Sequence, residues 1–212
     1  MRAYIYVGGE IDKTAIFEAP QEGDMTIAAD SGWHNALLLG VRPHTLLGDF
    51  DSIGKEKLPD AKEILQLPPE KDRTDTQLAV DLALSRGAKD FVIIGGLSGR
   101  LDHTYSNLAV LEYLAARGAH AVITDGFNRA RLLRNSGALI PRSAFRYLSL
   151  LAVDACVKGV TVKGCKYPLK NAKLYRHCQY AVSNEITGNC ALLSVKRGGV
   201  WIVESREKAE HL

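Results

Sequence analysis

The chain has 212 residues, of which 46% are hydrophobic and 24% are charged, with a formal net charge of +3. These proportions are typical of a globular protein that can build a substantial core. No stretch approaches the ~18 consecutive apolar residues of a membrane span. The apolar run at the N-terminus is too short for a signal peptide. We therefore expect a cytoplasmic protein that does not enter a membrane.

The charge is divided unevenly along the chain. Residues 1–135 carry 15 Lys and Arg against 19 Asp and Glu, whereas residues 136–212 carry 12 against 5. A basic C-terminal third could bind nucleic acid, contact an acidic surface on its own or another chain, or attract an anionic substrate. Because no nucleic-acid-binding motif accompanies the charge, we expect no nucleic-acid partner.

Two strands are predicted at the start of the chain. Residues 2–7 are apolar and aromatic and end in Gly8-Gly9, which indicates a strand and a tight turn. Residues 25–29 form the next apolar run and end in Asp30, before a helical pattern around residues 36–38. Asp30 could cap this helix. It could equally present a carboxylate at the C-terminal end of a strand, where open α/β sheets bind ligands.

The third predicted strand is followed by two acids. The apolar run at residues 45–47 leads directly to Asp49 and Asp51. A turn rich in Asp and Gly is one interpretation. A Mg²⁺ site is the other, since this ion is typically held by one or two carboxylates together with substrate phosphates. Asp75, at the start of a later helix, could supply a third carboxylate.

The stretch before that helix is the most charge-dense part of the chain. Residues 70–77 follow Pro68-Pro69, which forces an extended backbone. Lys71 and Arg73 could hold phosphate oxygens, Lys as a point charge and Arg through its forked geometry. For Asp72 we expect a helix cap or a salt bridge.

A glycine-rich loop follows the strand predicted at residues 90–94 and precedes a helix from Asp102 to about residue 117. Its glycines and terminal cation are Gly95, Gly96, Gly99 and Arg100. This order of strand, loop and helix is one that cradles phosphates with backbone N–H groups. The spacing matches neither the dinucleotide nor the P-loop fingerprint. Asp102 could cap the helix or face a ligand, and His103 could lie on the surface or contact a ligand.

The pattern changes after the strands predicted at residues 119–124 and 129–134. Up to this point strands alternate with helices, which favours an α/β fold with a mostly parallel, Rossmann-like sheet flanked by helices. Beyond it, short strand-like runs are separated by Gly and Asn turns, which favours a small all-β sandwich. We place an α/β nucleotide-binding and metal-binding domain at residues 1–137 and the β-sandwich domain at residues 138–212.

Two stretches of the second domain are candidates for ligand contact. Ser183 and Asn184 follow an apolar pair and could form no more than a turn. Tyr167 precedes a proline and could stack on a flat cationic ring, although an exposed tyrosine needs no function.

Taken together, five motifs resemble the thiamine pyrophosphokinase family, in order and over essentially the whole chain. They are Ala29-Asp30-Ser31-Gly32, Gly48-Asp49-Phe50-Asp51-Ser52, Thr74-Asp75, the run from Gly95 to His103, and Ser183-Asn184. The resemblance implies transfer of the pyrophosphoryl group of ATP to thiamine, giving thiamine diphosphate and AMP. It also implies a homodimer with active sites at the subunit interface.

The resemblance assigns roles to individual residues. The Mg²⁺ ligands and catalytic acids are Asp49, Asp51 and Asp75. The ATP-phosphate loop contains Gly95, Gly96, Gly99 and Arg100, and to this site we add Lys71 and Arg73 because of their charge and position. The thiamine site contains Asp102, Tyr167, Ser183 and Asn184, and the position of Tyr167 is Trp in some members. We also expect Asp30 to bind substrate. One of the acids could accept the proton of the attacking alcohol, and the sequence does not assign it.

Two other functions are compatible with parts of the pattern. Asp49 and Asp51 resemble the D-x-D motif of phosphatases with an aspartate nucleophile, but that motif normally follows the first strand of its fold and here it follows the third. A nucleotide-sensing module is the non-catalytic alternative, although such a module has little use for three carboxylates near phosphates without a metal.

Overall fold

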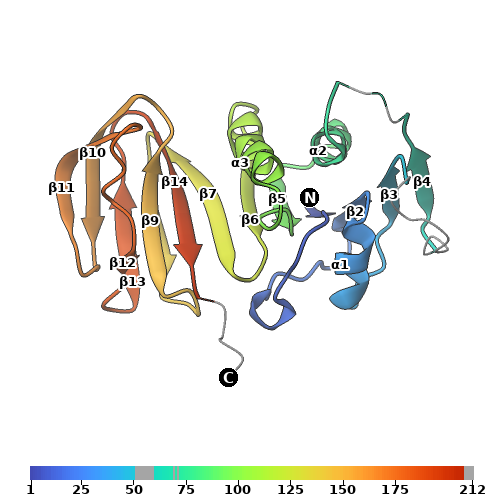
Figure 1. Ribbon diagram of the computed structural model, residues 1–212, viewed down its shortest axis with the longest axis horizontal. Coiled ribbons are helices and arrows are strands. Elements are labelled where there is room, and N and C mark those ends of the chain that lie inside the picture. Colours follow the sequence, from blue (N-terminus) through green and yellow to red (C-terminus); the bar gives the residue numbers. More distant parts are fainter. Residues whose placement is uncertain (51–59, 69, 71, 208–212) are drawn as a thin grey trace. The chain divides into compact units, whose positions relative to one another are not determined.

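The computed structural model describes residues 1–50, 60–68, 70 and 72–207. The chain forms two compact units, Met1–Gly126 and Phe127–Leu212, and each is described by itself (Figure 1). None of the helices in the described part of the chain is long and apolar enough to span a membrane.

The first unit is built on a parallel sheet, as the alternation of strands and helices predicts. Its strands are β1 (Arg2–Tyr6), β2 (Met25–Ala29), β3 (Thr45–Gly48), β4 (Glu63–Gln66), β5 (Asp90–Ile94) and β6 (His120–Thr124). They lie in the order β6-β5-β1-β2-β3-β4, and every neighbouring pair is parallel. The carboxyl ends of β1, β2, β3 and β5 therefore meet at one edge of the sheet.

Helices cover both faces of this sheet (Figure 1). On one face, α1 (Gly32–Leu38) buries Trp33 and Ala36 against Tyr4 and Tyr6 of β1. The other face is covered by α2 (Asp75–Ser85) and α3 (Leu101–Ala115). A short 3₁₀ turn, η1 (Lys13–Ala15), lies between β1 and β2. Because successive strand residues point to opposite faces, strands covered on both sides are apolar throughout.

The second unit contains two antiparallel sheets and no helix among its described residues. One sheet has the order β12-β9-β14-β7, from Asn184–Glu185, Tyr147–Ala152, Gly199–Ser205 and Asn128–Arg134. The other has the order β11-β10-β13-β8, from Leu169–Tyr175, Cys156–Lys163, Cys190–Ser194 and Gly137–Pro141. A mainly parallel α/β unit followed by an antiparallel β unit is thus confirmed.

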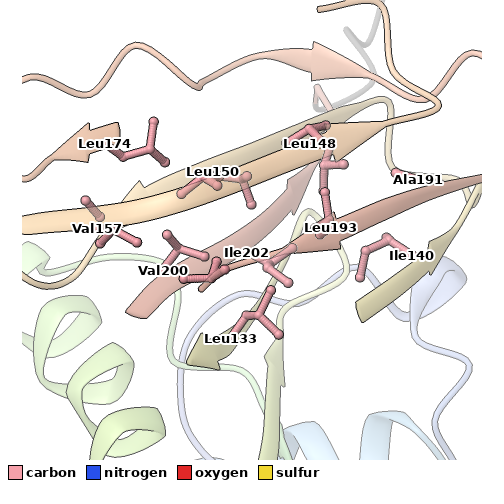
Figure 2. Packing of buried hydrophobic residues seen from close by; sticks show 14 of the residues in the cluster. Leu133, Ile140, Leu148, Leu150, Val157, Leu174, Ala191, Leu193, Val200 and Ile202 are labelled. Atoms are coloured by element: carbon pink, nitrogen blue, oxygen red, sulfur yellow. The ribbon is translucent and has the colours of Figure 1, made fainter. Parts of the chain in front are cut away.

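The two antiparallel sheets bury their facing side chains in one cluster (Figure 2). Leu150, Val200 and Ile202 come from the first sheet, and Val157 and Leu193 come from the second. The alternation of buried and exposed residues is clearest in β9 and β13, which is the pattern of strands with one buried face.

The division between the units falls earlier than the domain boundary of 137/138 expected from the sequence. Strand β7 lies in the second unit because it pairs along its whole length with β14, from Asn128 opposite Ser205 to Arg134 opposite Gly199. In the sequence, β7 follows the last α/β strand without a change of composition, so only its pairing partner reveals where it belongs.

Candidate active site

A cavity of about 390 Å³ opens at the carboxyl edge of the parallel sheet. It is lined by the loops after β1, β2 and β5 and by the first turns of α2 and α3. The lining residues are Val7, Gly8, Gly9, Ala29, Asp30, Ser31, Thr74, Asp75, Thr76, Gly96, Ser98, Arg100, His103 and Asn107. Two carboxylates, one guanidinium and one imidazole thus share a cavity whose remaining wall is mostly backbone and small polar side chains.

Glycines allow the loops after β1 and β5 to pack backbone against backbone. The Gly96 N–H donates to the Gly8 carbonyl at 2.9 Å. Gly95 and Gly96 have φ of +96° and +73°, and a Cβ at Gly95 would lie 2.4 Å from the Val7 carbonyl oxygen. A Cβ at Gly96 would lie 2.5 Å from the side-chain nitrogen of Asn107. No larger residue fits at either position without moving the loop.

Of the predicted phosphate loop, Gly96 and Arg100 line the cavity and Gly95 and Gly99 do not. Gly95 instead packs against the loop after β1, since a Cβ there would meet the carbonyl oxygens of Val7 and Gly8. Gly99 has φ of +84° with no described atom near its missing Cβ, so it serves the turn alone.

Two buried asparagines hold these loops in place, and the sequence analysis does not identify them. Asn35 of α1 donates to the carbonyls of Val7 and Gly9 at 2.8 and 2.9 Å. Asn107 of α3 donates to the Gly96 carbonyl at 2.9 Å. A polar residue on the buried face of a helix is the sequence signal that could have identified both, because buried amides must find partners.

Asp30 is placed by direct contact between the ends of β2 and β3. Its N–H donates to the Leu47 carbonyl at 2.7 Å, and its φ is +47°. A Cβ at Gly48 would lie 3.1 Å from the Asp30 Cα, so glycine permits the close approach. Asp30 lines the cavity, while Asp49 follows Gly48 as a half-buried residue outside the lining set. Asp51 lies outside the described residues.

Asp75 enters the cavity as the first residue of α2. The preceding Thr74 is the N-cap, and its hydroxyl accepts the N–H of Gln77 at 3.2 Å. An acid in the first turn is stabilised by the positive end of the helix dipole. The sequence Thr-Asp-x-Gln thus fixes where the helix starts and which side chain its first turn presents.

Arg73 lies outside the cavity lining and is bound to α2. Its Nη1 donates to Asp81 Oδ2 at 2.5 Å. Asp81 also accepts hydrogen bonds from Gln77 and from the hydroxyl of Tyr113 in α3. Lys71, the other cation predicted here, lies outside the described residues.

Arg100 and Asp102 form a forked ion pair at the start of α3. Nη2 and Nε of Arg100 lie 2.6 and 3.1 Å from the two carboxylate oxygens of Asp102. The hydrogen bond from Arg100 is the main reason why the pKa of Asp102 lies below its ordinary value, so this acid is ionised at neutral pH. Arg100 rather than Asp102 occupies the N-cap position, so the predicted capping role of Asp102 is not observed.

The donor set at the cavity suits a hard cation that is completed by its substrate. Asp30 and Asp75 offer carboxylate oxygens to one cavity, and Asp49 follows the strand end beside Asp30. Within the described ranges, no three His, Cys, Asp or Glu side chains are grouped closely enough to hold a metal ion by themselves. Mg²⁺ is commonly bound by one or two carboxylates plus phosphate oxygens and water, so the residues fit that ion.

The second unit has a small cavity of about 110 Å³ of its own. Apolar side chains, two exposed tyrosines and one asparagine line it: Leu148, Leu150, Val162, Tyr167, Leu169, Tyr180, Ala181, Val182 and Asn184. Tyr167 and Asn184 thus line the same cavity, whereas Asp30 and Asp102, also predicted for the thiamine site, are not among its lining residues. Ser183 lies between lining residues with φ of +55°, and its N–H donates to Ser149 Oγ at 3.0 Å. Tyr180 belongs to the same stretch as Ser183 and Asn184, and it is a further lining aromatic to which the sequence analysis assigns no role.

Both units match models of known families. Residues 18–123 match "Thiamin pyrophosphokinase, catalytic domain", and residues 138–199 match "Thiamin pyrophosphokinase, vitamin B1 binding domain". Among curated proteins, the chain is 28% identical over 193 residues to the thiamine pyrophosphokinase of Bacillus subtilis (strain 168), covering 88% of this chain and 89% of that one. It is 25% identical over 171 residues to thiamin pyrophosphokinase 1 of Caenorhabditis elegans, covering 76% and 70%.

Solved structures of similar proteins have the same fold. The crystal structure of thiamine pyrophosphokinase from Bacillus subtilis superimposes with a TM-score of 0.86 at 26% identity, covering 98% of this chain and 100% of that one. The enzyme from Geobacillus thermodenitrificans gives 0.83 at 27% identity, covering 99% of each chain. Thiamin pyrophosphokinase from Candida albicans, at 14% identity and a TM-score of 0.72 over 97% and 89%, shows likeness of fold alone.

Proposed function

Because the chain belongs to the thiamine pyrophosphokinase family, we propose that the cavity of its first unit binds ATP with Mg²⁺. The reaction of the family is transfer of the pyrophosphoryl group of ATP to thiamine. The observation that supports this assignment is the joint presence of Asp30, Asp75, Gly96 and Arg100 at the carboxyl edge of one parallel sheet. Phosphates need donors and cations, and a divalent ion needs the acids.

We assign the phosphate chain to the loop between β5 and α3. Helix α3 directs its first N–H groups toward this end of the sheet, and Arg100 adds a cation whose fork matches phosphate geometry. Backbone can approach the phosphates closely at Gly96 because no side chain intervenes. Gly95, Gly99, Lys71 and Arg73 stay predicted members of the same phosphate site.

Asp49, Asp51 and Asp75 are the proposed ligands of Mg²⁺, which when bound neutralises charge on the phosphate oxygens and polarises the reacting phosphorus. The protein's own contribution is positioning, which carries most of the rate enhancement in phosphoryl-type transfers. Thr74 fixes the first turn of α2 and hence the side chain of Asp75. The hydrogen bond from the Asp30 N–H to the Leu47 carbonyl holds the ends of β2 and β3 together.

For thiamine we propose the small cavity of the second unit. Tyr167 lines this cavity and is the proposed π face for the cationic thiazolium ring. Asn184, which also lines it, and the adjacent Ser183 are the proposed polar contacts. Asp30 and Asp102 are the proposed acids that balance the charge of thiamine. We further propose a cytoplasmic homodimer with active sites at the subunit interface, which sedimentation at assay concentration would test.

The deciding experiment is incubation of the purified protein with ATP, thiamine and Mg²⁺, followed by separation of the nucleotides. AMP and thiamine diphosphate in equal amounts are the expected products. Thiamine-independent release of inorganic phosphate would indicate hydrolysis instead. Binding of ATP without turnover, in a protein that melts cooperatively, would favour a sensing role and contradict the proposal.

A further inference from the structure

We propose that Tyr180 is a specificity-determining residue that gives the small cavity of the second unit a second aromatic wall, in addition to Tyr167, for the cationic ring of thiamine. This inference rests on the proposed function, in which that cavity takes the thiazolium ring. Tyr180 lies in the segment between β11 and β12, is 51% exposed and lines the cavity. None of the five motifs that resemble the family contains it.

The cavity lies between the two sheets of the second unit. Leu148 and Leu150 line it from β9 of one sheet, and Val162 and Leu169 line it from β10 and β11 of the other. Its volume of about 110 Å³ is well below the roughly 300–1,000 Å³ of sites that enclose a whole drug-sized ligand. A molecule of the size of thiamine would therefore place only one of its rings there.

The lining favours the thiazolium ring over the aminopyrimidine ring. Among the described residues, no charged side chain lines the cavity, and its amide is that of Asn184. The Oδ1 atom of Asn184 already accepts the N–H groups of Tyr167 and Glu185, both at 2.9 Å. An aminopyrimidine ring needs hydrogen-bond partners when it is buried. The thiazolium ring instead carries a positive charge, which the faces of aromatic rings attract.

Contacts on both sides of Tyr180 fix its position before a ligand binds. The side chain of Gln179 accepts a backbone N–H of β9 at 3.0 Å, and the Ala181 carbonyl accepts another at 2.8 Å. The Tyr180 hydroxyl donates to the Lys173 carbonyl of β11 at 2.9 Å. The side chain thus reaches from a segment beside one sheet to a strand of the other, across the sandwich that contains the cavity. A side chain held in this way loses little further freedom on binding.

The two tyrosines differ in the protein cations that surround them. Lys166 Nζ lies 5.6 Å from the centre of the Tyr167 ring and 3.8 Å from Glu185 Oε1. A ligand cation on that face of Tyr167 would therefore meet a like charge. In the part of the chain that the structure describes, no Lys or Arg lies over the ring of Tyr180. Tyr180 is thus the aromatic wall at which a cationic ligand has no protein cation to displace.

The test compares thiamine with a neutral analogue in which a thiophene ring replaces the thiazolium ring. Calorimetry on the full-length protein measures the Kd of both. Y180L keeps an apolar side chain and removes the π face. We expect it to raise the Kd of thiamine about fivefold and that of the analogue less than about twofold, the size expected of one cation–π contact. Y180F loses only the hydroxyl group that donates to Lys173, so it should keep the preference for thiamine and lower the melting temperature.

The matched control is Y175L, because Tyr175 is an exposed tyrosine of the same unit that does not line the cavity. It should leave both Kd values unchanged. Parental Kd values in Y180L, an equal loss of thiamine and analogue, or the same selective loss in Y175L would overturn the role of Tyr180. Should Y180L not fold, Y180M removes the same π face and must show the selective loss.

Failure of the proposed function gives a different result. If the parent protein forms AMP and thiamine diphosphate while Y167A and Y180L both bind thiamine as the parent does, thiamine does not bind in this cavity. If the parent protein forms neither product, the proposed reaction itself is wrong. A normal reaction with a thiamine defect in Y167A and none in Y180L contradicts the inference about Tyr180 alone.

Discussion

The side chain of Asn184 closes a ring of two hydrogen bonds with the backbone of Tyr167. Its Oδ1 accepts the Tyr167 N–H at 2.9 Å, and its Nδ2 donates to the Tyr167 carbonyl at 2.7 Å. Tyr167 lies in the turn between β10 and β11, directly after Lys166, whose N–H donates to the Glu185 carbonyl of β12 at 2.9 Å. Asn184 continues this attachment by one residue, and it holds an aromatic side chain that is 59% exposed at the small cavity.

Replacing Asn184 with Ala should therefore weaken thiamine binding through Tyr167. We expect N184A to raise KM for thiamine by about tenfold. The two lost hydrogen bonds contribute about 1 kcal/mol each, and part of this free energy keeps the Tyr167 ring in position. KM for ATP should change little. Steady-state kinetics with each substrate varied in turn measures both values.

Two variants of Tyr167 test whether thiamine binding depends on the aromatic ring or on its hydroxyl group. Y167F keeps the face of the ring and should behave like the parent enzyme, whereas Y167A should reproduce the thiamine defect of N184A. An N184A enzyme with unaltered KM for thiamine would show that the two hydrogen bonds between Asn184 and Tyr167 stabilise the turn only.

Replacing Asp75 with Asn should change the dependence of activity on Mg²⁺. The helix start is fixed by Thr74, so D75N should fold normally while it loses one proposed anionic ligand of Mg²⁺. We expect kcat to fall by two or more orders of magnitude, the range typical when a group that stabilises charge in the transition state is removed. The Mg²⁺ concentration at half-maximal rate should rise. D72N, which alters a neighbouring exposed acid, is the control, and a D75N enzyme with the parental Mg²⁺ curve would remove Asp75 from the metal site.

A comparison of Gly96 with Gly99 tests the packing under the proposed phosphate loop. Both glycines have positive φ, +73° and +84°, so alanine costs about 1 kcal/mol of backbone strain at either position. At Gly96 the new Cβ would also lie 2.5 Å from Asn107 Nδ2 and 2.8 Å from Val7 Cγ2, whereas at Gly99 no described atom lies within 4 Å. We expect G96A to lower the free energy of unfolding by about 3 kcal/mol and G99A by about 1 kcal/mol. Urea unfolding measures both, and equal losses would mean that the loop relaxes freely around Asn107.

Much of the fold and part of the site could be predicted because the signals are local. Apolar runs that end in Gly or Asp mark the strand ends, and the parallel arrangement brings those ends to one edge, which is why Asp30, Asp75 and Arg100 lie in one cavity. The N-cap at Thr74 can be predicted in the same way, because a threonine three residues before a glutamine is typical of a helix start.

Other features depend on contacts that no local pattern reveals. Asn35 and Asn107 are ordinary helix residues in the sequence, and only the carbonyls they meet on other elements identify their role. Arg73 is eight residues from Asp81 and outside the helix, so helical periodicity does not pair them. Likewise β7 looks like the last strand of the α/β pattern until its pairing with β14 is known.

The pair formed by Arg134 and Asp154 gives the second unit a measurable response to acid. Arg134 donates two hydrogen bonds to the Asp154 carboxylate at 2.9 and 3.2 Å, and the Gly199 N–H donates a third at 2.8 Å. The bonds from Arg134 are the main cause that lowers the pKa of Asp154 below its ordinary value of 3.8. Folding therefore favours the ionised carboxylate, which means that the stabilisation is complete above the ordinary value and is lost as the pH falls through the lower value of the folded protein.

D154N removes this contribution at every pH, which makes it the reference for the experiment. Because the two side chains are 39% and 37% exposed, solvent screens the pair, and we expect D154N to cost only about 1 kcal/mol of unfolding free energy near neutral pH. The difference between parent and variant should stay constant above about pH 5 and shrink in more acidic solution, where the parent carboxyl also becomes neutral. Urea unfolding of both proteins between neutral and acidic pH measures it. A difference that grows on acidification would mean that Asp154 is destabilised in its ionised form, the opposite of what its three donors imply.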